Sequence, residues 1–240
     1  MTPVTLELRF APPLRFLLAP RHRQGTVHLD QEPTSTLGHA VQSLGVPLTE
    51  VGELRVHDRP ATPDHRPAHG EVVDVLAHQW PQTVPFDPVR FLLDVHLGTL
   101  ARRLRLLGVD TAYHNDRDDP SLVAQANDEE RVLLTRDRGL LHRKNLRAGG
   151  HVRPDRPDDQ LHEVLARFAP ALRPWTRCPA CNGLLTPVAK HQVQNRLEPG
   201  TRATQESFAR CRSCDRVYWP GSHHARLDRI VRRAQEAAPR

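Results

Sequence analysis

Lysine is almost missing from this chain of 240 residues, because Lys144 and Lys190 are the only two and arginine carries the rest of the basic charge. Long apolar runs are also missing, and none approaches the ~20 residues that a membrane-spanning helix needs. The opening residues, MTPVTLELRF, lack the basic start and apolar core of a secretory signal. The sequence therefore predicts a cytoplasmic protein without a membrane partner.

Three common catalytic signatures are absent as well. The phosphate-binding loop GxxxxGK[ST], the dinucleotide fingerprint GxGxxG and the nucleophile elbow GxSxG do not occur. The sequence thus gives no support for a nucleotide-dependent motor, a dehydrogenase or a nucleophile-elbow hydrolase.

The chain is basic overall, with a formal net charge of +6 and an isoelectric point of about 9.7. This balance favours a polyanionic partner, and the planar guanidinium of arginine suits bidentate contact with phosphate. The alternative is a general compositional bias, which would also account for the abundant alanine, proline and leucine.

All four cysteines fall into two CxxC pairs, which are Cys178 with Cys181 and Cys211 with Cys214. In a cytoplasmic protein this spacing predicts a tetrahedral structural Zn²⁺ site, in which each pair forms a knuckle with both thiolates on one metal. Two disulfides or free thiols are the alternatives. The zinc interpretation leaves no cysteine unused.

Turn residues and shifts of composition divide the chain into four parts. Residues 1–78 predict a small α+β domain with the element order β-β-α-β-β of a β-grasp fold, and residues 79–88, with three prolines, predict a linker. Residues 89–173 predict an α/β domain. Residues 174–240 predict a zinc ribbon, built on a β-hairpin between the cysteine pairs, and a final basic helix.

In the first part, the expected strands cover residues 4–10, 26–29, 54–57 and 71–76, and the expected helix covers 34–44, ending at Gly45. In the α/β part, the expected strands cover 89–93, 110–113, 132–135 and 151–153, and the expected helices cover 98–107, 138–144 and 158–168, with a further helix beginning at Asp119-Pro120. The runs 91–93 and 132–135 are almost wholly apolar, which is typical of parallel strands buried on both faces. We therefore expect a parallel sheet flanked by helices.

Two aspartates, Asp94 and Asp137, come at the ends of these two apolar runs. Because parallel strands end at one shared edge of a sheet, the two carboxylates can converge there, and converging carboxylates call for a cation between them. Asp119, at the start of a helix, is the third candidate. Together they predict a Mg²⁺ or Mn²⁺ site at which a metal-activated water attacks a phosphodiester. Each also has a structural alternative, since Asp119 can serve only as a helix N-cap and Asp137 can cap the helix after it.

Four arginines near these aspartates are candidates for binding substrate phosphates. Arg102 and Arg105 are three positions apart and are expected on one helix face, whereas Arg136 and Arg138 flank Asp137. A solvated helix face, or ion pairs with neighbouring carboxylates, is the alternative interpretation.

The end of the chain mixes aromatic and basic residues. Tyr218 and Trp219 stand beside Arg216, and the final helix carries Arg226, Arg229, Arg232 and Arg233. This combination suits stacking and phosphate contacts with single-stranded RNA. Packing of the two aromatic residues between the ribbon and the α/β domain is the alternative.

The stretches 91–94, 100–111 and 133–141 resemble the Mut-seven C-terminal RNase family, a branch of the PIN-like nucleases. The cysteine ribbon, the segment 217–223 and the N-terminal ubiquitin-like unit resemble the same family, so that the match covers essentially the whole chain.

This resemblance implies a PIN fold and divalent-metal-dependent cleavage of RNA, with Asp94, Asp119 and Asp137 as the metal ligands. PIN nucleases typically carry a fourth acidic residue, for which the candidates here are Asp116, Asp118, Glu129 and Glu130.

Residues 43–50 and 64–75 also resemble the ubiquitin-like sulfur-carrier proteins. Those proteins work through a free C-terminal Gly-Gly, whereas this chain continues through residues 77–80 without that pair. The resemblance thus implies the fold and not sulfur carriage, and we interpret the domain as an appendage that contacts protein or RNA.

The preferred hypothesis is a metal-dependent ribonuclease with structural Zn²⁺ and catalytic Mg²⁺ or Mn²⁺. The alternative is a non-catalytic RNA-binding or ribosome-associated adaptor, which the basic charge, the ribbon and the unassigned fourth acid favour. A sulfur-transfer partner is a third hypothesis, against which the missing Gly-Gly argues.

Overall fold

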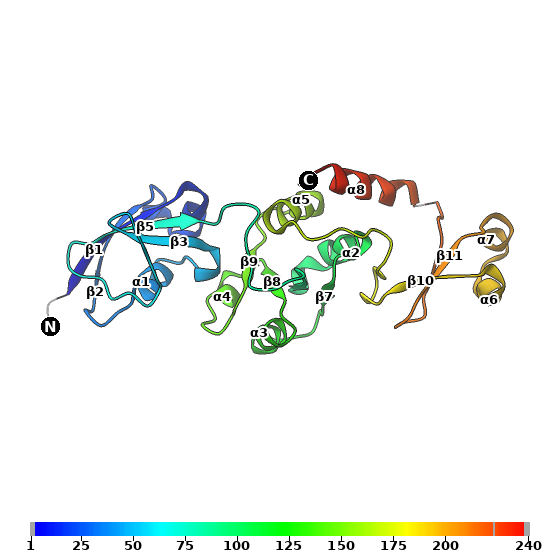
Figure 1. Cartoon of the computed structure of the whole chain (residues 1–240), viewed down its shortest axis with the longest axis horizontal. Helices are drawn as coiled ribbons and strands as arrows, with labels where there is room; N and C mark the ends of the chain where they lie inside the picture. Colours follow the sequence, from blue (N-terminus) through cyan, green and yellow to red (C-terminus); the bar gives the residue numbers. More distant parts are fainter. Residues whose placement is uncertain (1–2, 223, 238–240) are drawn as a thin grey trace. The chain divides into compact units, whose positions relative to one another are not determined.

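The computed structural model describes residues 3–222 and 224–237. Two compact units are present: one contains the chain up to residue 82 together with 137–151, and the other contains 83–136 together with the chain from 152 onwards (Figure 1). These two units do not correspond one to one with the four parts expected from the sequence, and the four-part organisation stays a prediction. Within the described ranges, no helix has both the length and the apolar character that crossing a membrane requires.

The first unit is built on a five-stranded mixed sheet with the strand order β2-β1-β5-β3-β4. Its strands are β1 (Val4–Phe10), β2 (Thr26–Gln31), β3 (Val51–Val56), β4 (Arg59–Ala61) and β5 (Val72–Ala77). The first strand pairs in parallel with β5 and antiparallel with β2, and β3 pairs antiparallel with both β5 and β4. The β-grasp fold is therefore confirmed, and the short strand β4 is an element that the sequence pattern does not predict.

Helix α1 (Leu37–Ser43) shares one apolar core with this sheet, in which Ala40 and Val41 are buried together with Leu8 and Val73. The helix begins three residues later than the sequence predicts, because Thr36 is its N-cap and accepts a hydrogen bond from the His39 amide (3.2 Å). Short 3₁₀ helices complete this part of the unit: η1 (Pro12–Leu17), η2 (Pro20–His22) and η3 (Leu48–Glu50).

The first unit also contains α4 (Arg138–Leu141) and β9 (Gly149–His151). Arg138 donates hydrogen bonds to the carbonyls of Phe16 (3.2 Å) and Leu17 (3.3 Å), and its guanidinium lies 5.6 Å from the centre of the Phe16 ring. At the other end of this segment, the His151 amide donates to the carboxylate of Glu50 (2.7 Å), which is buried. The segment is therefore held to the β-grasp sheet domain at both ends.

A parallel sheet forms the centre of the second unit. Its central strand β6 (Phe91–Leu93) pairs in parallel with β7 (Thr111–Tyr113) on one side and β8 (Val132–Thr135) on the other. Every residue of β6 and β8 is buried, as the apolar runs predict.

Helices flank this sheet. They are the 3₁₀ helix η4 (Val95–Leu97), α2 (Gly98–Leu106), α3 (Asp119–Asp128), α5 (Pro157–Phe168) and α8 (His224–Ala237). Helix α3 packs against β6 and β8, α2 against β7 and α5, and α8 against α5. The expected parallel sheet with flanking helices is thereby confirmed.

The ribbon is an antiparallel three-stranded sheet with the order β10-β11-β12. Its strands are β10 (Leu185–Val188), β11 (Phe208–Cys211) and β12 (Val217–Tyr218). The chain between β10 and β11 forms three short helices, α6 (Lys190–Val193), η5 (Gln194–Arg196) and α7 (Pro199–Thr204), which bury Val193 and Leu197 against Phe208. The two hairpin strands pair as expected, but the connection between them is helical.

A polar network around Asp110 joins the ribbon to the parallel sheet. Arg131 donates to the Asp110 carboxylate (2.6 Å), Arg177 forms an ion pair with it (2.9 Å), and the Asn182 amide donates to it (2.8 Å). Burial raises the pKa of Asp110, but the hydrogen bonds from Arg131 and Asn182 and the nearby positive charges outweigh this and hold the pKa below its usual value.

The first cysteine knuckle, Cys178–Cys181, is held against the parallel sheet by two further sets of hydrogen bonds, from Arg105 and Thr111. Arg105 is buried and donates to the carbonyls of Thr111 (2.8 Å), Pro179 (3.2 Å) and Ala180 (3.0 Å). The Thr111 amide in turn donates to the Asn182 side chain (3.0 Å). The knuckle therefore docks on β7 and α2 through charge-assisted hydrogen bonds, which are stronger than neutral ones.

Replacing Asp110 by asparagine is expected to lower the free energy of unfolding by roughly 2–3 kcal/mol at pH 7, because Arg131 and Arg177 lose their counter-charge. The folded-state pKa of Asp110 lies below the ordinary value of 3.8. Its contribution is therefore present above that value and is lost as the pH falls through the folded-state pKa. Urea denaturation of wild type and variant from pH 7 to about pH 3 should show a difference that shrinks toward the acid end.

The control for this measurement is Asp128→Asn, a change of an exposed carboxylate at the end of α3. It should leave stability within about 0.5 kcal/mol of wild type. A difference for Asp110→Asn that stays constant over the whole pH range would contradict the account.

Candidate active site and metal centre

Asp94 follows the last residue of β6 and is almost fully buried, with 8 % of its surface exposed. One carboxylate oxygen accepts a hydrogen bond from the Val95 amide (2.5 Å), and the other accepts one from the Thr135 hydroxyl (2.8 Å). Its own amide donates to the Leu134 carbonyl (3.1 Å), which continues the ladder between β6 and β8. The carboxylate is therefore fixed in orientation, and each oxygen retains lone pairs for another partner.

Thr135 is a site residue that the sequence analysis misses. It is fully buried at the end of β8, where the pairing of Leu93 with Leu134 brings it next to Asp94. The signal that predicts it is a single hydroxyl at the end of an otherwise apolar strand, combined with the parallel register of the two strands.

Tyr113, at the end of β7, supports the turn that follows Asp94. Its hydroxyl donates to the Val95 carbonyl (3.0 Å). A Cβ atom at Gly98 would lie 2.8 Å from this hydroxyl, so a larger residue there would displace the Tyr113 side chain. The chain after Asp94 is thus held by both neighbouring strands.

Asp119 is the first residue of α3, but it is not the N-cap that the sequence analysis allows it to be. The cap is Asp118, whose carboxylate accepts a hydrogen bond from the Ser121 amide (3.1 Å). This bond lowers the pKa of Asp118. Capping by Asp118 means that the carboxylate of Asp119 is not required to start the helix.

Three of the four candidates for a fourth acidic residue are engaged in local structure. Asp118 is the cap of α3, Glu129 forms an ion pair with Arg131 (2.5 Å), and Glu130 lies 3.7 Å from Arg90. These contacts leave the exposed Asp116 as the candidate without a structural role among the described contacts.

Asp137 lies in the first unit and caps α4, where its carboxylate accepts a hydrogen bond from the Gly139 amide (2.7 Å). The capping role that the sequence allows for this residue is therefore present. Its carboxylate is exposed, in contrast to that of Asp94.

The four candidate arginines differ in what they contact. Arg102 is exposed on α2, whereas Arg105, three positions further along the same helix, is buried and donates to backbone carbonyls. Burial lowers the pKa of Arg105, and its carbonyl partners offset the cost of desolvation. Arg136 forms an ion pair with Asp155. Arg138 binds the β-grasp domain, as described above.

The four cysteine sulfurs form a compact group, with each ligand atom within 4.8 Å of the others. The Sγ atoms of Cys178 and Cys214 are 3.7 Å apart, and those of Cys181 and Cys211 are 3.4 Å apart. A tetrahedral site with metal–sulfur bonds of about 2.3 Å requires sulfurs about 3.8 Å apart. All four thiols are free, so the disulfide alternative does not hold here.

The electrostatics of this group also call for a cation. Burial, with the neighbouring sulfurs, raises the pKa of Cys181 to about 12, whereas at Cys178 the hydrogen bonds with Tyr218 and nearby amides outweigh burial and lower the pKa to about 7. The amides of Ser213 and Cys214 point at the Cys211 sulfur, at 3.4 and 3.5 Å. Four thiolates form here only when a divalent metal neutralises them, and the cluster is consistent with structural zinc.

Among the described residues, the four cysteines are the only group of three or more potential ligands that lie close enough to share a metal. Near the ribbon, His224 packs its ring against Trp175, with the ring centres 4.8 Å apart. His223, which ends the segment 217–223 used for the resemblance, lies outside the described residues.

The structure thus combines a β-grasp domain, a parallel α/β domain and a four-cysteine ribbon, in that order along the chain. The model of the Mut7-C RNAse domain matches residues 89–231, more than half of the chain, and the model of the Mut7-C ubiquitin domain matches residues 3–82. The chain therefore belongs to the Mut7-C RNAse domain family, which supports a nuclease function with RNA as substrate. No curated protein and no solved structure matches it.

Changing Arg138 to glutamine is expected to lower the free energy of unfolding by about 1–2 kcal/mol, because two carbonyl contacts and the contact with the Phe16 ring are lost. RNA affinity should stay at the wild-type value, which fluorescence anisotropy measures. The matched control is Lys144→Gln, which removes an exposed basic charge from the same segment. A loss of RNA affinity without a loss of stability would restore the phosphate-binding role expected from the sequence.

The purified protein is expected to contain about one zinc ion per chain, and Cys178→Ser should abolish it. Because the same knuckle accepts hydrogen bonds from Arg105, the variant should also lose thermal stability. Elemental analysis and thermal unfolding measure both effects. Ser213→Ala, which changes the knuckle without removing a sulfur, is the control, and zinc retained by Cys178→Ser would refute the assignment.

Proposed function

We propose that this protein is a metal-dependent ribonuclease, with Asp94, Asp119 and Asp137 as ligands of Mg²⁺ or Mn²⁺ and a structural Zn²⁺ on the four cysteines. The observation that carries the proposal is the buried Asp94 carboxylate at the end of the central parallel strand. In α/β proteins, the reactive groups lie at the carboxyl-terminal ends of the parallel strands. The family match supplies RNA as the substrate class.

The donor set suits a hard divalent cation, which prefers carboxylate oxygens. When bound, such an ion would activate water and polarise the scissile phosphodiester. Asp94 would bind it in the orientation that Thr135 and Val95 impose. Asp137 is only two residues beyond Thr135 in the sequence, and Asp119 begins the helix that packs against β6 and β8.

Of the four arginines that the sequence suggests, Arg102 and Arg136 remain in the proposal as phosphate contacts, because both reach the surface. Arg105 and Arg138 are assigned to structural roles instead. The β-grasp domain is proposed to bind a protein partner or RNA.

The second candidate function is a non-catalytic RNA-binding or ribosome-associated adaptor. The observation that favours it is that the Asp137 carboxylate already caps α4 by accepting from the Gly139 amide. It predicts RNA binding that falls steeply with salt and does not lead to cleavage.

The deciding experiment is cleavage of labelled single-stranded and structured RNAs with Mn²⁺, Mg²⁺ or EDTA. We expect metal-dependent cleavage by wild type and a loss of roughly 100-fold or more in Asp94→Asn, because a metal ligand is removed. Asp128→Asn, which changes an exposed carboxylate, should cleave normally. Equal cleavage by wild type and Asp94→Asn would refute the catalytic site, and binding without cleavage by wild type would establish the adaptor.

Removing the Thr135 hydroxyl tests whether its hydrogen bond to the Asp94 carboxylate orients that carboxylate. Thr135→Val keeps the shape of the side chain but leaves one oxygen of Asp94 without its donor, at a cost of about 1–2 kcal/mol in stability. Cleavage should fall while RNA affinity is kept, and the metal concentration at half-maximal activity should rise. An unchanged metal dependence would show that Thr135 only stabilises the strand end.

A further inference from the structure

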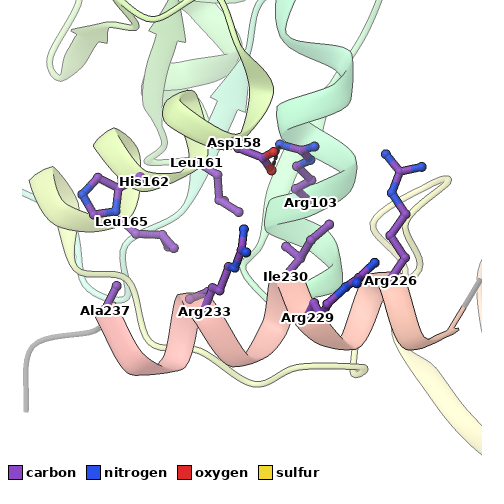
Figure 2. A pocket seen from close by; sticks show the side chains of 11 residues that line it. Arg103, Asp158, Leu161, His162, Leu165, Arg226, Arg229, Ile230, Arg233 and Ala237 are labelled. Carbon is purple, nitrogen blue, oxygen red and sulfur yellow. Dashed lines mark ion pairs between the residues drawn. The ribbon is translucent and has the colours of Figure 1, made fainter.

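Three helices of the second unit, α2, α5 and α8, enclose a cleft of about 430 Å³ that the proposed active site does not use (Figure 2). Its charged lining consists of Arg103 from α2, Asp158 and His162 from α5, and Arg226, Arg229 and Arg233 from α8. The view in Figure 2 shows the α8 arginines along one side and Arg103 with Asp158 on the other.

The balance of charge in this cleft is strongly positive. Asp158 is the only carboxylate among its described lining residues, and it is paired with Arg103 at 2.7 Å. The three arginines of α8 therefore face the cleft together with a single lining carboxylate, which is already paired with Arg103. Like charges gathered on one face repel one another, and this arrangement is stabilised when an anion lies between them.

The spacing of these arginines indicates an extended anion. Positions 226, 229 and 233 lie on one helix face, and at 1.5 Å per residue the row is about 10 Å long. Arg232, on the same helix, instead pairs with Asp228 (2.7 Å) and is not part of the lining. A single phosphate group is too small to contact the whole row, whereas a chain of phosphates can follow it.

The floor of the cleft is apolar and fixed in place. Leu161 and Leu165 from α5 and Ile230 from α8 line it, and Val231 and Ala234 are buried where α8 packs on the domain. An apolar floor beneath cationic side chains suits a nucleotide, whose base or ribose packs below while its phosphates contact the guanidinium groups.

We propose that this cleft, whose lining includes none of the three aspartates, binds the phosphate backbone of a single-stranded RNA. The assignment of RNA as the polymer rests on the proposed function, and the anion chemistry rests on the cleft itself. The helix α8 thereby serves as a second contact for the substrate strand, and binding there does not depend on the catalytic metal.

The test compares RNA affinity of the full chain by fluorescence anisotropy, in EDTA and over a range of salt concentrations. The triple change Arg226→Gln, Arg229→Gln and Arg233→Gln should weaken binding roughly tenfold or more and reduce the slope of log affinity against log salt by about 2, since each single-strand phosphate contact contributes about 0.7. Arg232→Gln, on the same helix but outside the cleft, is the matched control and should alter both values little.

A second variant covers the possibility that the triple variant does not fold. Asp158→Asn removes the one carboxylate of the lining and frees Arg103, so that RNA binding should become tighter at low salt. Unchanged affinity in both the folded triple variant and Asp158→Asn would overturn the proposal.

Competitors separate the sources of the anion. Excess single-stranded RNA should displace the labelled strand, and inorganic phosphate at the same phosphate concentration should not. Displacement by inorganic phosphate would show that the cleft binds a single phosphate group and not a strand. Equal displacement by single-stranded DNA would show that the cleft has no preference for RNA. Binding of anionic lipid vesicles in place of RNA would overturn the assignment. Because all of this is measured in EDTA, the outcome is independent of whether Asp94→Asn abolishes cleavage.

Discussion

The parallel alignment of β6 with β8 is the constraint on which the candidate active site depends. A strand that is buried on both faces must satisfy its backbone groups within the sheet, and the resulting register pairs Leu93 with Leu134. That register brings the next residue of each strand together, so that the Thr135 hydroxyl meets the Asp94 carboxylate. The orientation of a buried acid is therefore fixed by an apolar pairing, and a slip of one residue would turn its side chain to the other face.

The ribbon is part of the folded α/β domain, because its first knuckle completes a polar network that neither part can satisfy alone. Asp110 neutralises Arg131 and Arg177 and accepts from Asn182, and Arg105 places its charge against the knuckle carbonyls. Without the knuckle, buried charges beside β7 would lose their partners, which is more costly than losing exposed contacts. A metal held by the four cysteines would therefore stabilise the edge of the parallel sheet as well as the ribbon.

The sequence predicts the elements that apolar periodicity defines, and it misses those whose partners are distant in the chain. The buried strands β6 and β8 are recognisable because nearly every residue in them is apolar. The short helices α6 and α7 are not, since they bury only Val193 in their own spans. Thr135 and Asn182 act through contacts that only the folded register creates, and the buried role of Arg105 depends on carbonyls about 75 positions further along. Helical spacing alone places Arg102 and Arg105 together, but it does not predict which side of the helix another part of the chain will cover.

Arginine has three separate roles in this chain, and its net charge therefore says little about where RNA binds. Arg105 and Arg131 are buried and pair with carbonyls and carboxylates, whereas Arg138 attaches the segment of Asp137 to the β-grasp domain. Lysine at either buried position would offer a single ammonium group, whereas the planar guanidinium of arginine donates to several acceptors at once. Arginines that reach the surface remain available for polyanion binding, and Arg226, Arg229 and Arg233 line one cleft together from α8. The sequence alone marks this helix as basic, but the cleft that its arginines line forms only when α8 packs against α5, with Val231 and Ala234 buried.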